Sequence, residues 1–153
     1  RRGHWLALTV QSNSLNWGFN LVTKYPRADY VVLDEQELRL ACGSRNGHLE
    51  GLIREQAQRM ETAMFAITLG HQGCLLYDGH GFTTMPPMAD RVVDRMGAGD
   101  AFLAWTAPLV NVGAPAALVG LVGNVAGGLE AGMMGNQVVT RSMVNRVLKA
   151  VLA

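Results

Sequence analysis

Cysteine is scarce in this sequence, and neither sign of charge is in marked excess. Cys42 and Cys74 are its only two cysteines and lie far apart, so they form neither a metal-ligand cluster nor a disulfide framework. A reducing compartment, the cytoplasm, is therefore expected. Lys and Arg number 13 against 12 for Asp and Glu, which leaves a net charge of +1. This balance gives no electrostatic reason to expect nucleic acid or an anionic membrane as a partner.

The chain also lacks a starting Met and the long apolar stretch of a signal peptide, which indicates a fragment or a processed chain. Residues 101–129 carry no charge, but Pro108 and Pro115 interrupt them and no Lys or Arg cluster flanks them. Two buried helices of a soluble domain are expected there, rather than a membrane span. The total of 153 residues, 49% of them hydrophobic, predicts one domain with a substantial core.

Apolar stretches alternate with polar and glycine-rich ones in the manner of an α/β domain. Strand patterns cover residues 5–10, 28–33, 64–69 and 74–77, with a further strand-like pair at 92–93. Helix patterns cover residues 15–25, 38–41, 49–61, 101–110 and 141–152, with another helix after the turn at 111–115 and with Thr140 as the cap of the last. The alternation predicts three layers, a mostly parallel sheet with helices on both faces. Ligand sites are then expected where the carboxyl ends of the strands meet.

A glycine turn at Asp94-Arg95-Met96-Gly97-Ala98-Gly99-Asp100 precedes the helix pattern at 101–110. Gly97 and Gly99 lack Cβ, so the backbone can turn tightly and approach a ligand closely. The first amides of a helix have no partner within it and the helix dipole adds positive potential, so this turn suits an anion such as phosphate. Asp100 has two interpretations that the spacing leaves open. It is either a general base for a hydroxyl that attacks a phosphoryl group, or the N-cap of the helix.

Other polar segments follow strand patterns. Asp34-Glu35-Gln36-Glu37 places three carboxylates at the end of one strand, where they either begin a helix or hold a divalent metal beside phosphates. Gln11-Ser12-Asn13-Ser14 follows the first strand and is either part of a ligand site or a plain loop. Gly70 and Gly73 lie between two strands, where most such pairs are turns.

Gly97-Ala98-Gly99-Asp100-Ala101-Phe102, preceded by Asp94, resembles the GAGDAF signature of the ribokinase-like sugar kinases, the phosphofructokinase-B family. The resemblance covers most of the chain, but only the C-terminal part of a typical family member. It implies a three-layer ribokinase-like domain. The implied reaction is ATP-dependent phosphoryl transfer to a hydroxyl of a sugar or sugar phosphate, with ATP and Mg²⁺ as cofactors.

By this resemblance, Gly97, Ala98 and Gly99 form the anion hole and Asp100 is the catalytic base. Residues 1–153 then form a single α/β domain, the nucleotide-binding and base-bearing part of a sugar kinase. The N-terminal sugar-binding and lid part is missing, so the fragment alone is expected to be inactive. The competing hypothesis is a non-catalytic nucleotide-sensing or assembly module that has kept the fold.

The resemblance also implies nucleotide contacts. Residues 68–73 are similar to the family's Thr-x-Gly-x-x-Gly segment, which implies that Thr68, Gly70 and Gly73 contact the nucleotide. Asn124 has the place of an Asn that lies close to the nucleotide in the family. Its alternative role is to satisfy a backbone group, while the neighbouring glycines allow close packing of helices.

Asp34 and Glu37 are similar to the family's Asn-x-x-Glu motif, with Asp34 in the Asn place, which implies Mg²⁺ near both, directly or through water. Met96 has no hydroxyl to offer the monovalent cation that several relatives bind at this turn, which counts against cation activation. Residues 11–13 and 25–30 resemble the branch near bacterial heptose-phosphate kinases. A sugar or sugar phosphate is the implied partner, and a homo-oligomer is compatible with the sequence.

Overall fold

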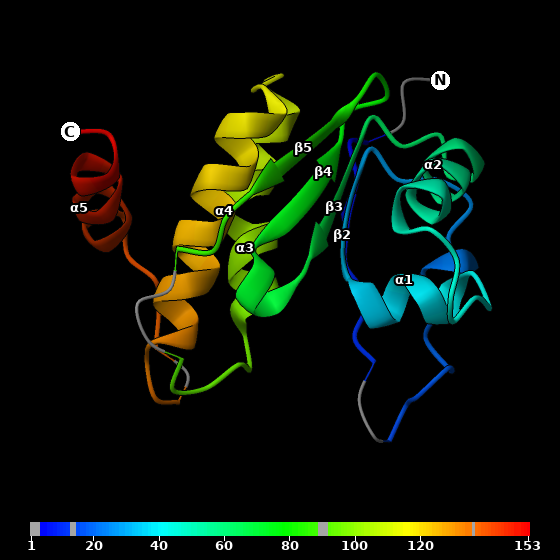
Figure 1. Cartoon of the computed structure of the whole chain (residues 1–153), viewed down its shortest axis with the longest axis horizontal. Coiled ribbons are helices and arrows are strands. Elements are labelled where there is room, and N and C mark those ends of the chain that lie inside the picture. The colour runs from blue at the N-terminus through cyan, green and yellow to red at the C-terminus, as the bar shows by residue number, and fades with distance from the viewer. Residues whose placement is uncertain (1–3, 13–14, 89–91, 136) are drawn as a thin grey trace.

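The computed structural model describes residues 4–12, 15–88, 92–135 and 137–153 of the chain. The strands along these residues are β1 (Ala7–Leu8), β2 (Tyr30–Asp34), β3 (Met64–Thr68), β4 (Cys74–Tyr77) and β5 (Phe82–Met85) (Figure 1). The α-helices are α1 (Glu35–Ala41), α2 (Leu49–Arg59), α3 (Ala98–Asn111), α4 (Ala116–Ala131) and α5 (Arg141–Val151), and short 3-10 helices lie at Val22–Lys24 and Gly70–Gln72.

The strands form one sheet in the order β1-β2-β3-β4-β5. β1, β2 and β3 run parallel, whereas β4 is antiparallel to both β3 and β5. The sheet is therefore mixed, and the expectation of mostly parallel pairing holds for β1, β2 and β3 but not for the two hairpin pairs formed by β4. Connection length explains the difference: residues 69–73 and 78–81 are too short for the crossover that parallel strands need, so each closes a hairpin. The sequence patterns did not predict β5.

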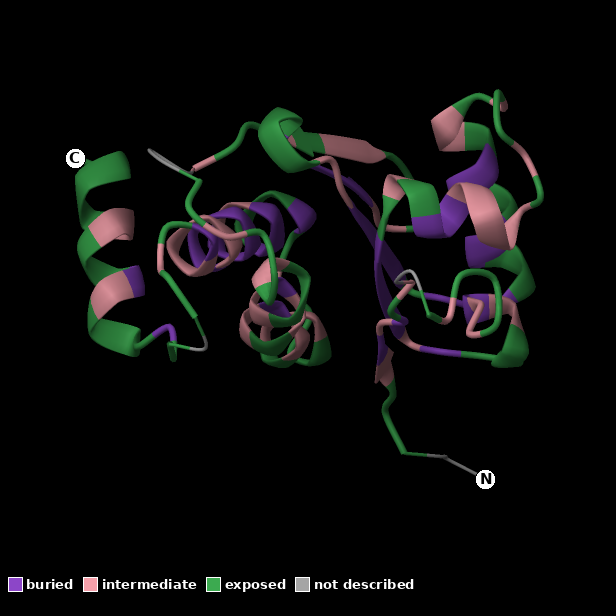
Figure 2. Ribbon diagram, turned by 90° about the horizontal axis from the view of Figure 1, so that it is seen from below, coloured by how far each residue is buried: buried purple, intermediate pink, exposed green. Residues whose placement is uncertain are grey.

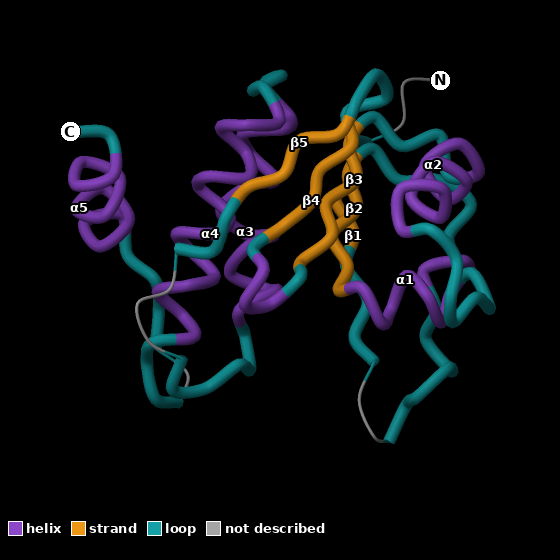
Figure 3. Tube along the Cα trace, in the orientation of Figure 1, coloured by secondary structure: helices purple, strands orange, loops and turns teal. Residues whose placement is uncertain are grey.

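Helices cover both faces of the sheet, as a three-layer domain requires (Figures 1 and 3). α1 and α2 lie on one face, and α3 and α4 lie on the other. The side chains of β2 alternate between these layers: Val31 and Leu33 belong to the core under α1 and α2, and Tyr30 and Val32 to the core under α3 and α4. Because both faces of β2 are buried, its sequence is a continuous apolar run. Figure 2 shows that burial is concentrated in the strands and the inner sides of the helices.

Small residues allow α3 and α4 to pack closely against each other and against the sheet. A Cβ at Gly123 would collide with the ring of Phe102, and a Cβ at Gly120 would lie 2.7 Å from Cδ1 of Leu76. The turn between the two helices lies where it was expected. Pro108, however, lies inside α3 and does not interrupt it. No helix in the described part of the chain is long and apolar enough to cross a membrane.

The first part of the chain has less regular structure than its sequence indicates. The strand expected over residues 5–10 is limited to β1, and the helix expected over residues 15–25 is wrong. The described residues there form a turn and the 3-10 helix Val22–Lys24. Gly18 has a φ of +80°, which a right-handed helix does not allow, and the side chains of Leu15 and Phe19 are exposed rather than gathered on a buried face.

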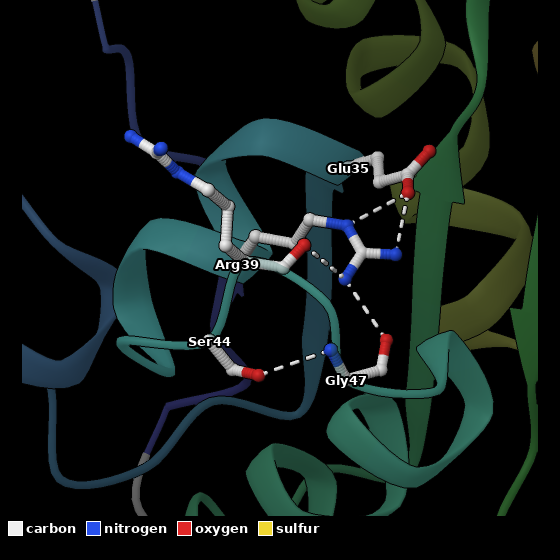
Figure 4. Close-up of polar contacts among 5 residues, drawn as sticks. Glu35, Arg39, Ser44 and Gly47 are labelled. Carbon is white, nitrogen blue, oxygen red and sulfur yellow. Dashed lines mark hydrogen bonds and ion pairs between the residues drawn. The ribbon is translucent and has the colours of Figure 1, made fainter.

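Arg39 fixes the connector between α1 and α2 (Figure 4). Its Nε donates to Oε1 of Glu35 at 2.8 Å, and one terminal nitrogen donates to the carbonyl oxygens of Arg45 and Gly47 at 3.2 and 2.9 Å. The amide of Gly47 donates in turn to Oγ of Ser44 at 3.2 Å. One guanidinium therefore supplies donors to a loop that has no regular structure of its own, and it holds that loop against α1.

Candidate functional site

The predicted site residues lie at one end of the strands of the sheet. Asp34, Thr68, Cys74 and Met85 are register partners in turn from β2 to β5, so they form a row across the carboxyl ends of β2 and β3. α1 and α3 both begin at this end of the sheet, the lower end in Figure 1. The structure thus brings together the segments 34–37, 68–73 and 97–100, which are far apart in the sequence. Ligands bind to α/β sheets at this end, where the strands have their carboxyl ends.

The start of α3 presents free amides. Gly97 is the N-cap residue, with a φ of +84°, and the first helical hydrogen bond runs from the amide of Ala101 to the carbonyl of Gly97 at 2.8 Å. The amides of the first three residues of α3 therefore have no partner within the helix. Within the described part of the chain, no side chain accepts from them either. Gly99 and Asp100 are exposed, so an anion has access to this helix start.

The segment before α3 is a loop rather than the strand expected at residues 92–93. The amides of Val93 and Asp94 both donate to the carbonyl oxygen of Ala131, at 2.7 and 3.0 Å, at the end of α4. Oδ1 of Asp94 accepts from the amide of Met96 at 3.0 Å. Val92 and Val93 have the apolar side chains of a strand, but the amide of Val93 pairs with the end of a helix. The glycine turn is therefore attached to α4 and not to the sheet.

Asp100 is the third residue of α3, and its side chain is exposed. The N-cap interpretation of Asp100 is wrong, because Gly97 occupies that position. Its place in the first turn still suits a negative charge, since the helix dipole is positive there. The role of Asp100 as a general base stays a prediction.

Asp34 and Glu37 form a capping box at the start of α1. The amide of Glu37 donates to Oδ1 of Asp34 at 2.7 Å, and the amide of Asp34 donates to Oε2 of Glu37 at 3.0 Å. Oε1 of Glu37 also accepts from the amide of Ser12 at 2.9 Å. The interpretation of these acids as a helix start is therefore confirmed. Glu37 also ties the loop after β1 to the end of β2.

The carboxyl group of Glu37 on α1 is affected by the charge of Asp100 on α3. Burial raises the pKa of Glu37 above its ordinary value, and the charges of Asp34 and Asp100 raise that pKa further. The hydrogen bonds from the backbone of Asp34 and Ser12 act in the opposite direction. No group of three or more His, Cys, Asp or Glu side chains in the described ranges could hold a metal alone. The metal role of Glu37 and Asp34 stays a prediction.

Gly70 and Gly73, which are both predicted to contact the nucleotide, differ in the space that surrounds them. Gly70 has a φ of +58°, and a Cβ there would point into open space. Gly73 has a φ of +87°, and a Cβ there would overlap the carbonyl oxygen of Met85, so this glycine is needed for packing against the end of β5. Oγ1 of Thr68 donates weakly to the carbonyl of Leu33 at 3.4 Å. Contact of these three residues with a nucleotide stays a prediction.

Asn124 binds backbone groups. Its Nδ2 donates to the carbonyl oxygens of Met85 and Pro86, at 3.1 and 2.6 Å, and the residue is buried. The interpretation that Asn124 satisfies backbone groups is thus confirmed, and so is the packing role of Gly120 and Gly123. Asn124 fixes the chain that leaves β5 to α4, at the same end of the sheet as Gly73. Its contact with a nucleotide stays a prediction.

Sequence reasoning missed Glu130. A Cβ at Gly97 would lie 3.0 Å from Oε1 of Glu130, so this half-buried carboxylate at the end of α4 lies against the glycine turn. The only sequence signal was its position as the first charged residue after the uncharged stretch 101–129. Besides Asp94, the turn therefore has one carboxylate within α3, Asp100, and another behind it, Glu130.

One family model and one known protein both match most of this chain. Residues 20–107 match the model of the pfkB family of carbohydrate kinases. Over 120 residues the chain is 32% identical to the bifunctional protein HldE of Magnetococcus marinus, an overlap of 73% of this chain and 24% of that relative. The chain therefore spans about a quarter of that relative's length.

Solved structures share the fold. Phosphofructokinase-2 of Escherichia coli, in complex with potassium, matches with a TM-score of 0.74 at 15% identity, over 83% of this chain and 42% of that one. Ribokinase of Thermotoga maritima matches with a TM-score of 0.69 at 23% identity, over 80% and 42%. A nucleoside kinase of Burkholderia thailandensis, in complex with inosine, matches with a TM-score of 0.66 at 25% identity, over 82% and 42%. More than half of each of these chains lies outside the match.

Proposed function

Because the chain belongs to the pfkB family of carbohydrate kinases, we propose that it carries the nucleotide-binding and base-bearing part of an ATP-dependent phosphotransferase. The acceptor is a hydroxyl of a sugar or sugar phosphate. One observation carries the proposal: the free amides at the start of α3 and the carboxylate of Asp100 lie on the same exposed helical turn. Phosphoryl transfer needs an anion-binding group and a proton acceptor side by side.

The amides of Ala98, Gly99 and Asp100 form the anion hole in this proposal. They are fixed by the helix before any ligand arrives, so no reorganisation is needed when charge develops on the transferring phosphoryl group. The absence of a Cβ at Gly99 leaves space for a phosphate oxygen to approach the backbone, and nothing in the described residues fills that space. The amides hold the phosphoryl oxygens and orient them toward the acceptor.

Asp100 takes the proton of the acceptor hydroxyl. A carboxylate beside a phosphate raises the electrostatic energy of the bound state, so its position here calls for a chemical role. Its exposed side chain leaves room for an acceptor on the outer side of α3. Transfer of the hydroxyl proton to the Asp100 carboxylate makes the acceptor oxygen a stronger nucleophile.

ATP and Mg²⁺ are the cofactors in this proposal, and the residues present fit them. Gly70 has open space above it at the sheet edge, which suits the nucleotide. Each oxygen of the Glu37 carboxylate accepts one backbone hydrogen bond and keeps a lone pair, and Asp34 is exposed, so both can bind an ion directly or through water. Mg²⁺ commonly takes one or two carboxylates, with phosphates and water as its other ligands. When bound, it would neutralise charge on the phosphates.

A heptose phosphate is the acceptor class that we favour. The resemblance of residues 11–13 and 25–30 to the heptose-phosphate kinase branch supports this, as does the match to HldE. The contacts that select the sugar would come from the part of the relatives that this chain does not cover. The sugar itself therefore has to be identified by assay.

The test is transfer of the γ-phosphate of ATP to a panel of sugars and sugar phosphates. A polypeptide that contains this chain within a complete kinase fold should phosphorylate one of them. Residues 1–153 alone should show negligible turnover, because positioning of the acceptor supplies much of the rate of such reactions. Nucleotide binding by the complete protein without transfer to any acceptor would favour the non-catalytic module instead.

A further inference from the structure

A groove is formed by α1, the connector that follows it and the turn that contains Trp17. It has a volume of about 420 Å³. Its lining comes from Trp17, from Gln36, Arg39 and Leu40 of α1, and from residues 43–45 of the connector. None of these residues belongs to the segments 68–73 and 97–100 of the proposed site. Sites for small molecules have volumes of this size, apolar walls and a few polar groups that fix the ligand.

The lining of the groove is positively charged. Its two charged residues are both arginines, and no Asp or Glu is among the lining residues. The charge of Arg39 is balanced by Glu35, whose Oε1 lies 2.8 Å from Nε and 2.8 Å from a terminal nitrogen of Arg39 (Figure 4). Arg45 is exposed, and within the described residues its guanidinium has no ion-pair partner. A guanidinium presents a fork of donors that matches a phosphate or a carboxylate.

The backbone that carries these donors is already fixed. One terminal nitrogen of Arg39 donates to the carbonyl oxygen of Arg45 at 3.2 Å and to that of Gly47 at 2.9 Å. Oγ of Ser44 accepts from the amide of Gly47 at 3.2 Å, which leaves the hydroxyl proton of Ser44 for another acceptor. Only the side chain of Arg45 has to be ordered when an anion binds, so the entropic cost of binding is small.

The groove also has an apolar wall. Trp17 is 52% exposed, and the half-buried Leu40 lines the same groove. Exposed aromatic surface of this kind packs well against another planar ring. Gly43 has a φ of +60°, and a Cβ there would enter open space, so no side chain fills the groove at this point.

A second hollow, of about 440 Å³ beside α2, lacks these features. Its lining includes Arg54, Glu61 and Tyr77, so both signs of charge are present. Arg54 lies 3.7 Å from Glu50 and 4.7 Å above the ring of Phe82. The ring of Tyr77 already lies 4.8 Å from that of Phe82. The cation and the aromatic ring of this hollow therefore have partners within the protein, unlike Arg45 and the exposed ring of Trp17.

We propose that the groove lined by Trp17, Leu40, Ser44 and Arg45, here called the α1 groove, binds a small organic anion that has a planar ring. The phosphate or carboxylate of this ligand binds the guanidinium of Arg45 and accepts from the hydroxyl of Ser44. The ring packs on Trp17 and Leu40. The inference does not depend on the proposed function, because it uses none of the residues assigned to phosphate or nucleotide.

The test is an NMR titration of the nitrogen-15-labelled chain with phenyl phosphate. The indole N–H of Trp17 and the amides of residues 43–45 should shift together, with a Kd of about 1 mM or lower, because so small a ligand makes few contacts. The amides of residues 58–62, at the second hollow, should not shift. Inorganic phosphate and phenol each supply one half of the ligand, so each should bind at least about tenfold more weakly.

Two variants test the two halves of the groove. R45E reverses the charge that holds the anion and should raise the Kd for phenyl phosphate by about tenfold or more. The control R146E makes the same reversal at an exposed position of α5 and should bind as the wild type does. W17A should reduce the affinity for phenyl phosphate to that for inorganic phosphate, and it also identifies the indole resonance of Trp17. The spectrum of each variant shows whether it is folded.

The amides of residues 98–100 report separately on the start of α3. Shifts at these amides without shifts at the α1 groove would support the anion hole of the proposed function and overturn this inference. Shifts at the groove alone would leave this inference standing and count against that anion hole. Equal affinities for phenyl phosphate and inorganic phosphate would mean an adventitious ion only. Binding by R45E at the wild-type affinity would also overturn the inference.

Discussion

The backbone of Gly97 lies directly against the carboxylate of Glu130. A Cβ built on Gly97 would stand 3.0 Å from Oε1 of Glu130, and the φ of Gly97 is +84°. Both facts require glycine at the N-cap of α3, although this position usually has a side chain that caps the helix. The turn therefore leaves its amides free at the cost of a helix cap.

This relationship predicts opposite effects for two neighbouring substitutions. Gly97→Ala should destabilise the protein by about 1–2 kcal/mol, the usual energy of a left-handed conformation for a residue with a Cβ. Gly99→Ala should stabilise it by about 0.5–1 kcal/mol, because Gly99 is helical and its Cβ would enter open space. Denaturant unfolding of both variants measures the difference. Equal stabilities would contradict the role given to Gly97.

The parts of the fold that could be predicted are those whose sequence pattern lies within the element itself. β2, β3, α2 and the last helix have apolar residues at the spacing of their own structure. The caps are local too: Oγ1 of Thr140 accepts from the amide of Met143, and Asp34 pairs with Glu37 three residues on. The glycine turn was recognisable because its motif is continuous in the sequence. Such signals need no knowledge of distant contacts.

The parts that were missed depend on contacts between distant residues. Val93 resembles a strand residue, but its amide pairs with Ala131 at the end of α4. Asn124 donates to Met85, 39 positions earlier in the chain, and Glu130 reaches back to Gly97. Side-chain chemistry indicated that Asn124 would need a partner, but not which one. The site is predictable as a motif, whereas its supports appear only in three dimensions.

Glu37 predicts a dependence of stability on pH. Burial, followed by the charges of Asp34 and Asp100, raises its pKa, so the folded protein holds this proton more tightly than the unfolded chain. The free energy of unfolding should therefore fall as pH rises from the ordinary pKa of a glutamate through the raised one. E37Q does not titrate, so the stability of the wild type relative to E37Q should decline over that window.

Unfolding of both proteins by denaturant over a series of pH values tests this. Asp100→Asn serves as the control, because removal of the Asp100 charge should move the window to lower pH. A wild-type curve parallel to that of E37Q would show that Glu37 does not titrate in this way.

Asn124 predicts a loss of stability that is independent of any nucleotide. Asn124→Asp removes the donor that serves the carbonyl oxygens of Met85 and Pro86 in a buried site. Two acceptors without a donor should destabilise the protein by about 1–3 kcal/mol. Gln58→Glu, an amide-to-acid change at an exposed position, should change stability by no more than about 0.5 kcal/mol. Thermal melts without ATP distinguish the two, and an unaffected Asn124→Asp variant would refute the supporting role.

Gly70 tests the nucleotide assignment. Gly70 and Gly79 both have positive φ and open space at Cβ, so valine should strain the backbone to a similar extent at either position. Only Gly70 follows β3 at the site edge, whereas Gly79 lies in the turn between β4 and β5. Gly70→Val should raise the Kd for ATP by about tenfold, equivalent to about 1.4 kcal/mol, and Gly79→Val should leave it unchanged. Calorimetry that finds equal affinities for the two variants would leave residues 68–73 as an ordinary hairpin.

Asp100 gives the sharpest test of the proposed chemistry. In a polypeptide with the complete kinase fold, Asp100→Asn should slow phosphoryl transfer by roughly 10²–10⁴, because Asn cannot accept the hydroxyl proton. ATP affinity should stay level or rise, since a negative charge near the phosphates has gone. Asp100 is exposed and is not the N-cap, so the substitution loses its interaction with the helix dipole, about 0.3–1 kcal/mol of stability, and also removes its repulsion of Glu37. A turnover number measured beside a thermal melt separates the two roles, and near-normal turnover would remove Asp100 from the mechanism.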